Sequence, residues 1–89
     1  MATRSWQNVT EQIFDCVKAK SKQEHGTVYE PPEGDNGICW TKISFLGKVV
    51  LKFNLAGGTL SYALVEKPGI VPESRIWDGI EETIESCRG

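Results

Sequence analysis

The stretch that decides the fold is LKFNLAGGTLSYAL, residues 51–64, in which two alternating segments flank a pair of glycines. Alternation of apolar and polar residues is typical of a strand with one buried face. A two-residue Gly-Gly loop matches the twist of the strands on either side of it, so it predicts a tight hairpin. The hairpin then aligns apolar residues opposite one another on a single face. These pairs are Leu55–Leu60, Phe53–Tyr62 and Leu51–Leu64.

A third strand precedes this hairpin, and the loop that connects it is compatible with two lengths. A two-residue loop at Gly47 would turn Lys42 toward the core, whereas a three-residue loop over residues 46–48 keeps Lys42 outside. Because burying an unpaired lysine costs far more than an uncommon loop, we predict the three-residue loop, which pairs Phe45 with Val49. The strands are then expected over residues 38–46, 48–56 and 59–67. Their core face is predicted to consist of Cys39, Ile43, Phe45, Val49, Leu51, Phe53, Leu55, Leu60, Tyr62 and Leu64.

One helix is predicted before the sheet, over residues 5–23, and another after it, over residues 72–87. In each of them apolar residues recur at helical spacing and form one stripe. Ser5 or Thr3 is expected to cap the first helix, and Gly26 is expected to end it. The stripes consist of Trp6, Val9, Ile13, Cys16 and Val17 in the first helix and of Ile76, Ile80, Ile84 and Cys87, with Trp77 beside them, in the second.

These elements predict a single α+β domain of 89 residues, a two-layer sandwich in which both helices pack on one face of an antiparallel meander. The meander has three strands, or four if residues 27–30 join it ahead of the polar loop at residues 33–37. Gly79 lies in the middle of the second helix, where glycine lowers helix stability. Its presence there is compatible with close packing of that helix on the sheet.

Charge and cysteine content narrow the classes of partner and compartment. The net charge is −2, so neither nucleic acid nor a membrane is expected as a partner, although a local basic patch is left open. The first twelve residues lack the apolar run of a signal peptide, which favours a cytoplasmic protein. The three cysteines, Cys16, Cys39 and Cys87, form no CxxC pair. We expect them to be reduced, buried apolar residues.

The sheet face that points away from the helices carries the candidate binding site. The predicted register places Trp40 opposite Asn54 and Asn54 opposite Ser61, with Lys42 and Lys52 in the next row. One interpretation is an ordinary face in solvent, which antiparallel sheets often have. A second is a protein interface, because tryptophan is enriched among interface hot spots and a short meander has edges that need cover. A third is a stacking platform for a small ligand or single-stranded nucleic acid.

From these alternatives we predict a non-catalytic interaction module, which forms a homodimer or binds another protein through this face or a sheet edge. Binding of a small ligand or of single-stranded nucleic acid on the same face is the first alternative, and a small enzyme of unspecified class is the second. The candidates for chemistry are isolated from one another: His25 at a helix end, the carboxylates of residues 30–35, and Cys39. They form no catalytic or metal-binding constellation, so no metal or cofactor is expected.

Overall fold

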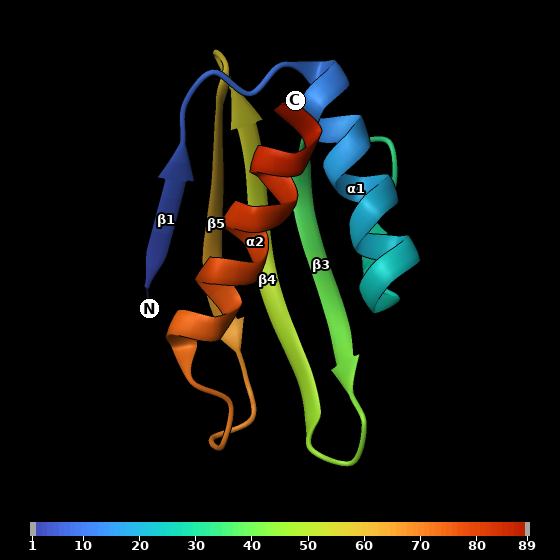
Figure 1. Ribbon diagram of the computed structural model, residues 1–89, viewed down its shortest axis with the longest axis vertical. Helices are drawn as coiled ribbons and strands as arrows, with labels where there is room; N and C mark the ends of the chain where they lie inside the picture. The colour runs from blue at the N-terminus through green and yellow to red at the C-terminus, as the bar shows by residue number, and fades with distance from the viewer. Residues whose placement is uncertain (1, 89) are drawn as a thin grey trace.

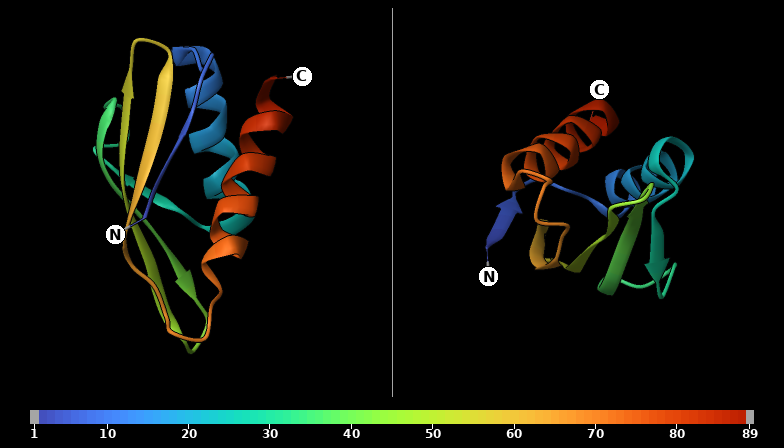
Figure 2. Two further views of the ribbon diagram at one scale, coloured as in Figure 1. Left: turned by 90° about the vertical axis from the view of Figure 1, so that its left-hand side faces the viewer. Right: turned by 90° about the horizontal axis from the view of Figure 1, so that it is seen from below.

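The structure is a computed structural model that describes residues 2–88. Two helices lie on the same side of a five-stranded antiparallel sheet, which has the order β1-β5-β4-β3-β2 (Figures 1 and 2). The predicted α+β class and two-layer arrangement are therefore confirmed, with two more strands than the minimum expected. The elements are β1 (Thr3–Trp6), α1 (Glu11–His25), β2 (Val28–Glu30), β3 (Asn36–Ile43), β4 (Gly47–Ala56), β5 (Thr59–Glu66) and α2 (Glu73–Arg88).

The central hairpin has the register that the sequence predicts. Leu55 pairs with Leu60, and the remaining pairs of β4 and β5 follow as expected as far as Leu51. Both turn residues have a positive φ, 58° at Gly57 and 79° at Gly58, a region that glycine enters without strain. The turn chemistry and the alternation of the strands therefore specify the same pairing. Residues 28–30 also join the sheet, as β2 at the edge next to β3.

The β3–β4 hairpin has a loop of the predicted length at a different place. The loop consists of residues 44–46, and Ile43 pairs with Gly47, so the prediction of a loop over residues 46–48 was wrong. Gly47 has a φ of 121°, which favours glycine immediately after the loop. The error changes every partner on β3 by an even number of positions, so the faces are preserved and Cys39 still points to the core. Phe45, however, lies in the loop and is fully exposed, contrary to its predicted place in the core.

The N-terminal segment is a strand where a helix was predicted. Residues 3–6 pair with β5, and α1 begins only at Glu11. Its N-cap is Thr10, whose Oγ1 accepts a hydrogen bond from the backbone N–H of Ile13 at 3.1 Å. The strand covers an edge of β5 that would otherwise leave its backbone groups unpaired. The helical spacing of Trp6 was therefore coincidental, whereas Gly26 ends the helix as predicted, with a φ of 69°.

The core lies between the sheet and the two helices, and aromatic side chains dominate it. The ring of Phe14, which is fully buried, lies 5.6 Å from the ring of Phe53 and 6.1 Å from that of Tyr29. Trp77 is buried near Trp6, with ring centroids 6.4 Å apart. The buried apolar residues are Val9, Phe14, Val17, Tyr29, Cys39, Val49, Leu51, Phe53, Leu55, Leu60, Tyr62, Leu64, Trp77 and Ile84.

Two of the three cysteines form a disulfide, so the prediction of three reduced thiols was wrong. Cys16 of α1 is bonded to Cys87 of α2, with Cα atoms 5.8 Å apart, and only Cys39 is a free, buried thiol. The partners are 71 positions apart in sequence, and only the packing of the two helices brings them together. Disulfides are uncommon in the cytosol, which weighs against the predicted cytoplasmic location. No helix within residues 2–88 is long and apolar enough to cross a membrane.

Candidate functional site

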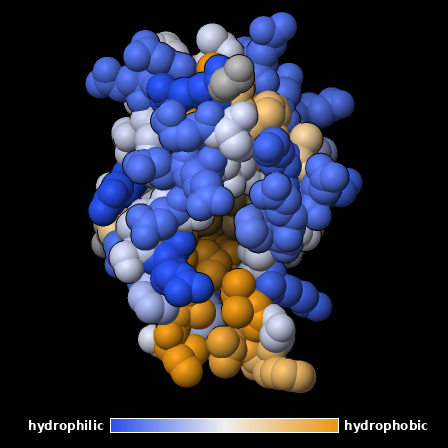
Figure 3. Space-filling model, in the orientation of Figure 1, coloured by the Kyte–Doolittle hydropathy of each residue, from blue (hydrophilic) through white to orange (hydrophobic). Residues whose placement is uncertain are grey.

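A cleft lies between the two helices because α1 is shorter than the strands it covers. A helix of 15 residues is about 22 Å long, whereas a strand of 10 residues is about 33 Å long. The disulfide joins Cys16, in the first half of α1, to Cys87, in the last turn of α2. In Figure 1, α1 stops well before the β3–β4 loop. The core face of β3 and β4 is therefore left partly uncovered, and a cavity of about 350 Å³ opens there. Figure 3 shows the hollow, with hydrophobic side chains inside it.

Apolar side chains form the walls of the cleft. They come from both helices, from the central strands and from the segment before α2. Partly buried residues near the mouth, such as Ile43 and Ile76, have contact surface available that the core does not use. The apolar wall residues are Val17, Ile43, Val49, Leu51, Val71, Ile76 and Ile80.

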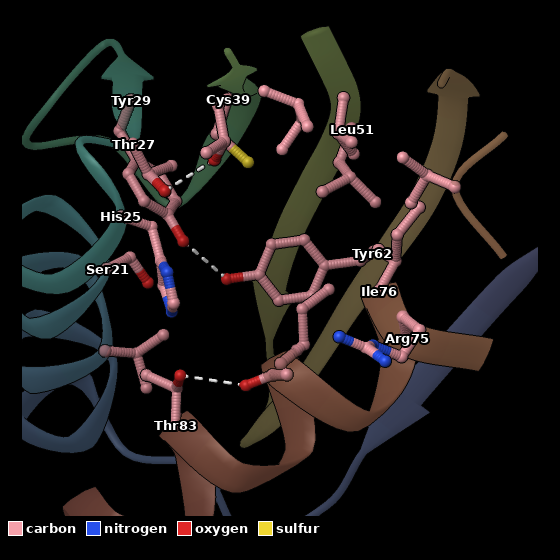
Figure 4. A pocket seen from close by; sticks show the side chains of 17 residues that line it. Ser21, His25, Thr27, Tyr29, Cys39, Leu51, Tyr62, Arg75, Ile76 and Thr83 are labelled. Atoms are coloured by element: carbon pink, nitrogen blue, oxygen red, sulfur yellow. Dashed lines mark hydrogen bonds between the residues drawn. The ribbon is translucent and has the colours of Figure 1, made fainter. Parts of the chain in front are cut away.

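Of the six hydroxyls that line the cleft, all but that of Ser21 have a hydrogen-bond partner within residues 2–88. The hydroxyls of Tyr29 and Tyr62 lie 2.7 Å apart, and the Oγ1 atoms of Thr27 and Thr41 lie 2.6 Å apart (Figure 4). Thr83 donates its hydroxyl hydrogen to the carbonyl of Gly79 at 2.9 Å in α2. No buried side-chain nitrogen or oxygen within residues 2–88 lacks a partner. The interior of the cleft therefore offers few unpaired polar atoms to which a polar ligand could bind.

The titratable groups of the floor are neutral at physiological pH. Burial raises the pKa of the Cys39 thiol to about 12. Burial also raises the pKa of Tyr29 and that of Tyr62 above their usual value. A thiol that stays protonated is a poor nucleophile, so Cys39 is placed as a packing residue of the floor.

Positive charge is confined to the mouth of the cleft. Among residues 2–88, Arg75, near the start of α2, is the one permanently charged residue that lines the cavity, and no aspartate or glutamate does so. His25, the last residue of α1, lies on the opposite side (Figure 4). Both residues are exposed. The arrangement combines an apolar interior with a cationic mouth.

Gly79 of α2 also lines the cleft. A Cβ atom at this position would meet nothing within 4 Å. Close packing on the sheet, for which the glycine was considered compatible, is therefore absent. The glycine instead leaves the helix side of the cleft open.

The residues predicted to bind lie on the outer face, which we define as the sheet face that points away from the helices. Lys52, Asn54 and Ser61 line a shallow depression of about 310 Å³. Trp40 pairs with Val50 rather than with Asn54, because of the shifted loop. Lys42 lies nearer the β3–β4 loop, opposite another lysine, Lys48. The structure therefore brings three of the five predicted residues together and leaves Trp40 and Lys42 outside that depression.

The polar loop after β2 is tied to α1 by a lysine. The Nζ atom of Lys18 donates to the carbonyl of Pro32 at 3.1 Å and to that of Gly34 at 2.7 Å. It also lies 4.4 Å from the centre of the Phe14 ring. Within residues 2–88, no three histidine, cysteine, aspartate or glutamate side chains gather at a place suited to a metal ion. The loop therefore has a structural attachment to the helix.

Sequence reasoning missed the cleft, although the helices carry a signal for it. In α1 the buried position Val17 is followed, at helical spacing, by Ser21 and His25, so the stripe becomes polar toward the end of the helix. In α2, Arg75 and Gly79 lie on the same side in the same way. A change from apolar to polar residues along a core-facing stripe indicates a place where the core opens.

No model of a known protein family, no characterised protein and no solved structure matches this chain. The function is therefore argued from the geometry of the chain itself.

Proposed function

We propose that this protein is a non-catalytic binding module that holds a small amphiphilic molecule in the cleft, with an anionic group of that molecule at Arg75. One observation carries the proposal: the cleft has apolar walls, hydroxyls that are paired with one another or with the backbone except at Ser21, and a single permanent charge, which lies at its mouth. Ligand sites are typically apolar cavities of roughly 300–1,000 Å³ with a few polar groups that fix orientation. The cleft, at about 350 Å³, fits the lower end of that range.

The apolar part of the ligand would supply most of the affinity. Each methylene moved from water into an apolar environment contributes about 0.8 kcal/mol, which corresponds to about a fourfold gain in affinity. Affinity is therefore expected to increase with alkyl chain length until the cleft is full. The neutral floor around Cys39 supports this choice, because a charged floor would oppose an alkyl chain.

The anionic group is favoured by what surrounds the mouth. A guanidinium donates two parallel hydrogen bonds to a carboxylate, and Arg75 is exposed and free to do so. The imidazole of His25, at the end of α1, offers a further N–H donor on the opposite side of the mouth. The carboxylates of α2 lie outside the cavity lining, and within residues 2–88 none of them forms an ion pair with Arg75. These carboxylates are Glu73, Asp78, Glu81, Glu82 and Glu85.

The test is a calorimetric titration with alkyl carboxylates, alkyl amines and alkanols of equal chain length, below their micellar concentrations. We expect the carboxylates to bind more tightly than the amines. Arg75→Gln should weaken carboxylate binding about tenfold or more and leave alkanol binding nearly unchanged. Arg4→Gln is the matched control, because Arg4 lies on β1, outside the cavity lining.

Two results would contradict this function. If no alkyl compound of any length binds, the cleft does not hold such a ligand. If carboxylates and amines bind equally well, or if Arg75→Gln and Arg4→Gln behave alike, the anionic preference is wrong.

A second candidate is self-association through the outer face, the function predicted from the sequence. It is favoured by apolar residues that lie exposed on the same face as Trp40, namely Val28, Ile38 and Val65. Val28 pairs directly with Trp40. Light scattering over a range of concentrations measures the molar mass. Trp40→Ala should convert a dimer to a monomer that remains folded, and a dimer that persists would remove this face from consideration.

A further inference from the structure

One end of the molecule carries its most exposed large apolar side chains. Phe45 has a relative exposure of 102%, Ile70 of 72% and Leu46 of 49%. Phe45 and Leu46 belong to the β3–β4 loop, and Ile70 belongs to the segment between β5 and α2. Figure 3 shows hydrophobic side chains gathered at this end, below the hollow of the cleft. We call the three side chains the apolar tip.

The two loops lie against each other and are internally ordered. A Cβ atom on Gly47 would come within 3.8 Å of the Pro68 ring, so the segments touch at their bases. The backbone N–H of Leu46 donates to the carbonyl of Ile43 at 2.7 Å, and that of Val71 donates to the carbonyl of Pro68 at 3.1 Å. The tip is therefore a formed surface. Large contiguous apolar patches are rare on monomers and mark places of interaction.

Three lysines lie at or beside the strand ends that lead into the loops of the apolar tip. Lys42 and Lys48 face each other across the last pairs of β3 and β4, an arrangement that is destabilising unless an anion lies nearby. Lys67 lies at the base of the other loop, where its Nζ donates to a backbone carbonyl at 3.4 Å. Within residues 2–88 the one ion pair is between Arg88 and Glu85, so these lysines form no ion pair. The one carboxylate that the described residues place at this sheet end is that of the exposed Glu66, which pairs with Val50 in the row next to the facing lysines.

We propose that this end docks on a membrane surface that contains anionic lipid. The apolar tip would insert at the boundary between headgroups and acyl chains, and Lys42, Lys48 and Lys67 would lie among the lipid phosphates and carboxylates. Insertion of a few apolar side chains together with basic residues is the usual chemistry of a protein that lies on a membrane. The inference goes beyond ligand binding in the cleft and does not depend on it.

The shape and charge of this end favour a lipid surface over a protein partner. The tip projects, so a protein partner would need a matching hollow, whereas a fluid lipid surface accommodates a projection. The local positive charge contrasts with the net charge of −2. The acidic side of α2 would be repelled by anionic lipid, and this repulsion would orient the tip toward the surface.

The experiment is sedimentation of the full chain with vesicles of phosphatidylcholine, with or without phosphatidylserine. We expect binding to the vesicles that contain phosphatidylserine, and weaker binding at high salt. Phe45→Ser should reduce the affinity about tenfold or more. Lys42→Gln and Lys48→Gln should each reduce it about fivefold.

Matched controls come from exposed residues away from this end. Ala19→Ser alters an exposed apolar side chain of α1, and Lys20→Gln removes a lysine from the same helix. Both variants should bind vesicles as the unaltered chain does. The altered residues are exposed, with Lys20 only partly so, and circular dichroism checks that each variant is folded.

Three outcomes would overturn the proposal. The first is that the unaltered chain does not sediment with either vesicle, and the second is that Phe45→Ser and Ala19→Ser bind equally well. The third is a dimer in solution that Phe45→Ser converts to a monomer, which would assign the tip to a second copy of the chain. Calorimetry with alkyl carboxylates on Phe45→Ser separates the two proposals, because cleft binding should persist in this variant.

Discussion

At the scale of single residues, burial determines the chemistry of the cleft floor. Cys39, Tyr29 and Tyr62 lie close together in the core, and each has a pKa above its usual value because burial disfavours the charged form. The hydrogen bond between the two tyrosine hydroxyls lets both remain neutral in an apolar environment. The same burial that keeps the floor uncharged also makes the fold sensitive to alkaline pH.

We expect the free energy of unfolding to decrease above about pH 9. The unfolded chain loses the thiol proton near the ordinary thiol pKa of 9.0, whereas the folded chain keeps it until the pKa of about 12. The contribution of the protonated thiol to the free energy of unfolding is therefore complete below pH 9 and is lost as the pH rises toward 12, by at most about 1.4 kcal/mol for each pH unit. Denaturant unfolding across this range measures it.

Cys39→Ala is the control for this pH dependence. It should remove the decrease between about pH 9 and pH 10, while the decrease due to Tyr29 and Tyr62 at higher pH remains. If the unaltered chain and Cys39→Ala depend on pH in the same way, the thiol is not protected by burial.

At the scale of elements, the N-terminal segment shows how tertiary pairing can override a helical pattern. Trp6 packs against Tyr62, with ring centroids 6.2 Å apart, from a strand rather than from a helix. Ser5 lies opposite Ser61, and their hydroxyls are 2.8 Å apart. Pairing with the edge of β5 satisfies backbone groups that a longer helix would have left exposed there. The helix therefore starts where Thr10 provides a cap.

The position of the cap gives a direct test of this boundary. Thr10→Ala should lower the free energy of unfolding by about 1 kcal/mol, because it removes the acceptor for the N–H of Ile13. Thr3→Ala is the matched control and should change stability less, since Thr3 is exposed on an edge strand. A larger loss for Thr3→Ala would instead support a helix that begins near residue 5. Chemical denaturation measures both variants.

At the scale of the whole molecule, one end is closed and the other is open. The disulfide joins α1 to the last turn of α2, while the cleft and the apolar tip lie toward the opposite end (Figure 3). Because α1 ends short of the strands, part of the sheet lines the cleft in which we propose that a ligand binds. The two proposed activities, ligand binding and membrane docking, use neighbouring parts of this open end.

The disulfide is expected to supply a large part of the stability of so small a domain. A cross-link between residues 71 positions apart stabilises the fold by about 4 kcal/mol in the chain-entropy model. Cys16→Ser combined with Cys87→Ser should lower the free energy of unfolding by roughly that amount. Cys39→Ala is the control that keeps the bond.

Counting thiols in the unfolded chain tests the same bond independently. Without reductant one thiol should react, that of Cys39, and with reductant all three should react. Three reactive thiols in a chain purified without reductant would contradict the pairing.

The sequence by itself determined the features that depend on neighbouring residues. The glycine pair specified the register of β4 and β5, because turn geometry and alternation act over a few positions. The cost of burying Lys42 correctly predicted which side chains of β3 face the core. Gly26 marked the end of α1, because helices commonly end at a residue with a positive φ, which glycine adopts without strain.

Only the tertiary structure decided the features that depend on distant residues. The pairing of β1 with β5, the bond between Cys16 and Cys87 and the cleft each require elements more than fifty positions apart to meet. No local pattern encodes these contacts, because they follow from the lengths of the helices relative to the strands and from how the layers pack. The binding surface belongs to this second group, since it is the part of the sheet that the helices do not reach.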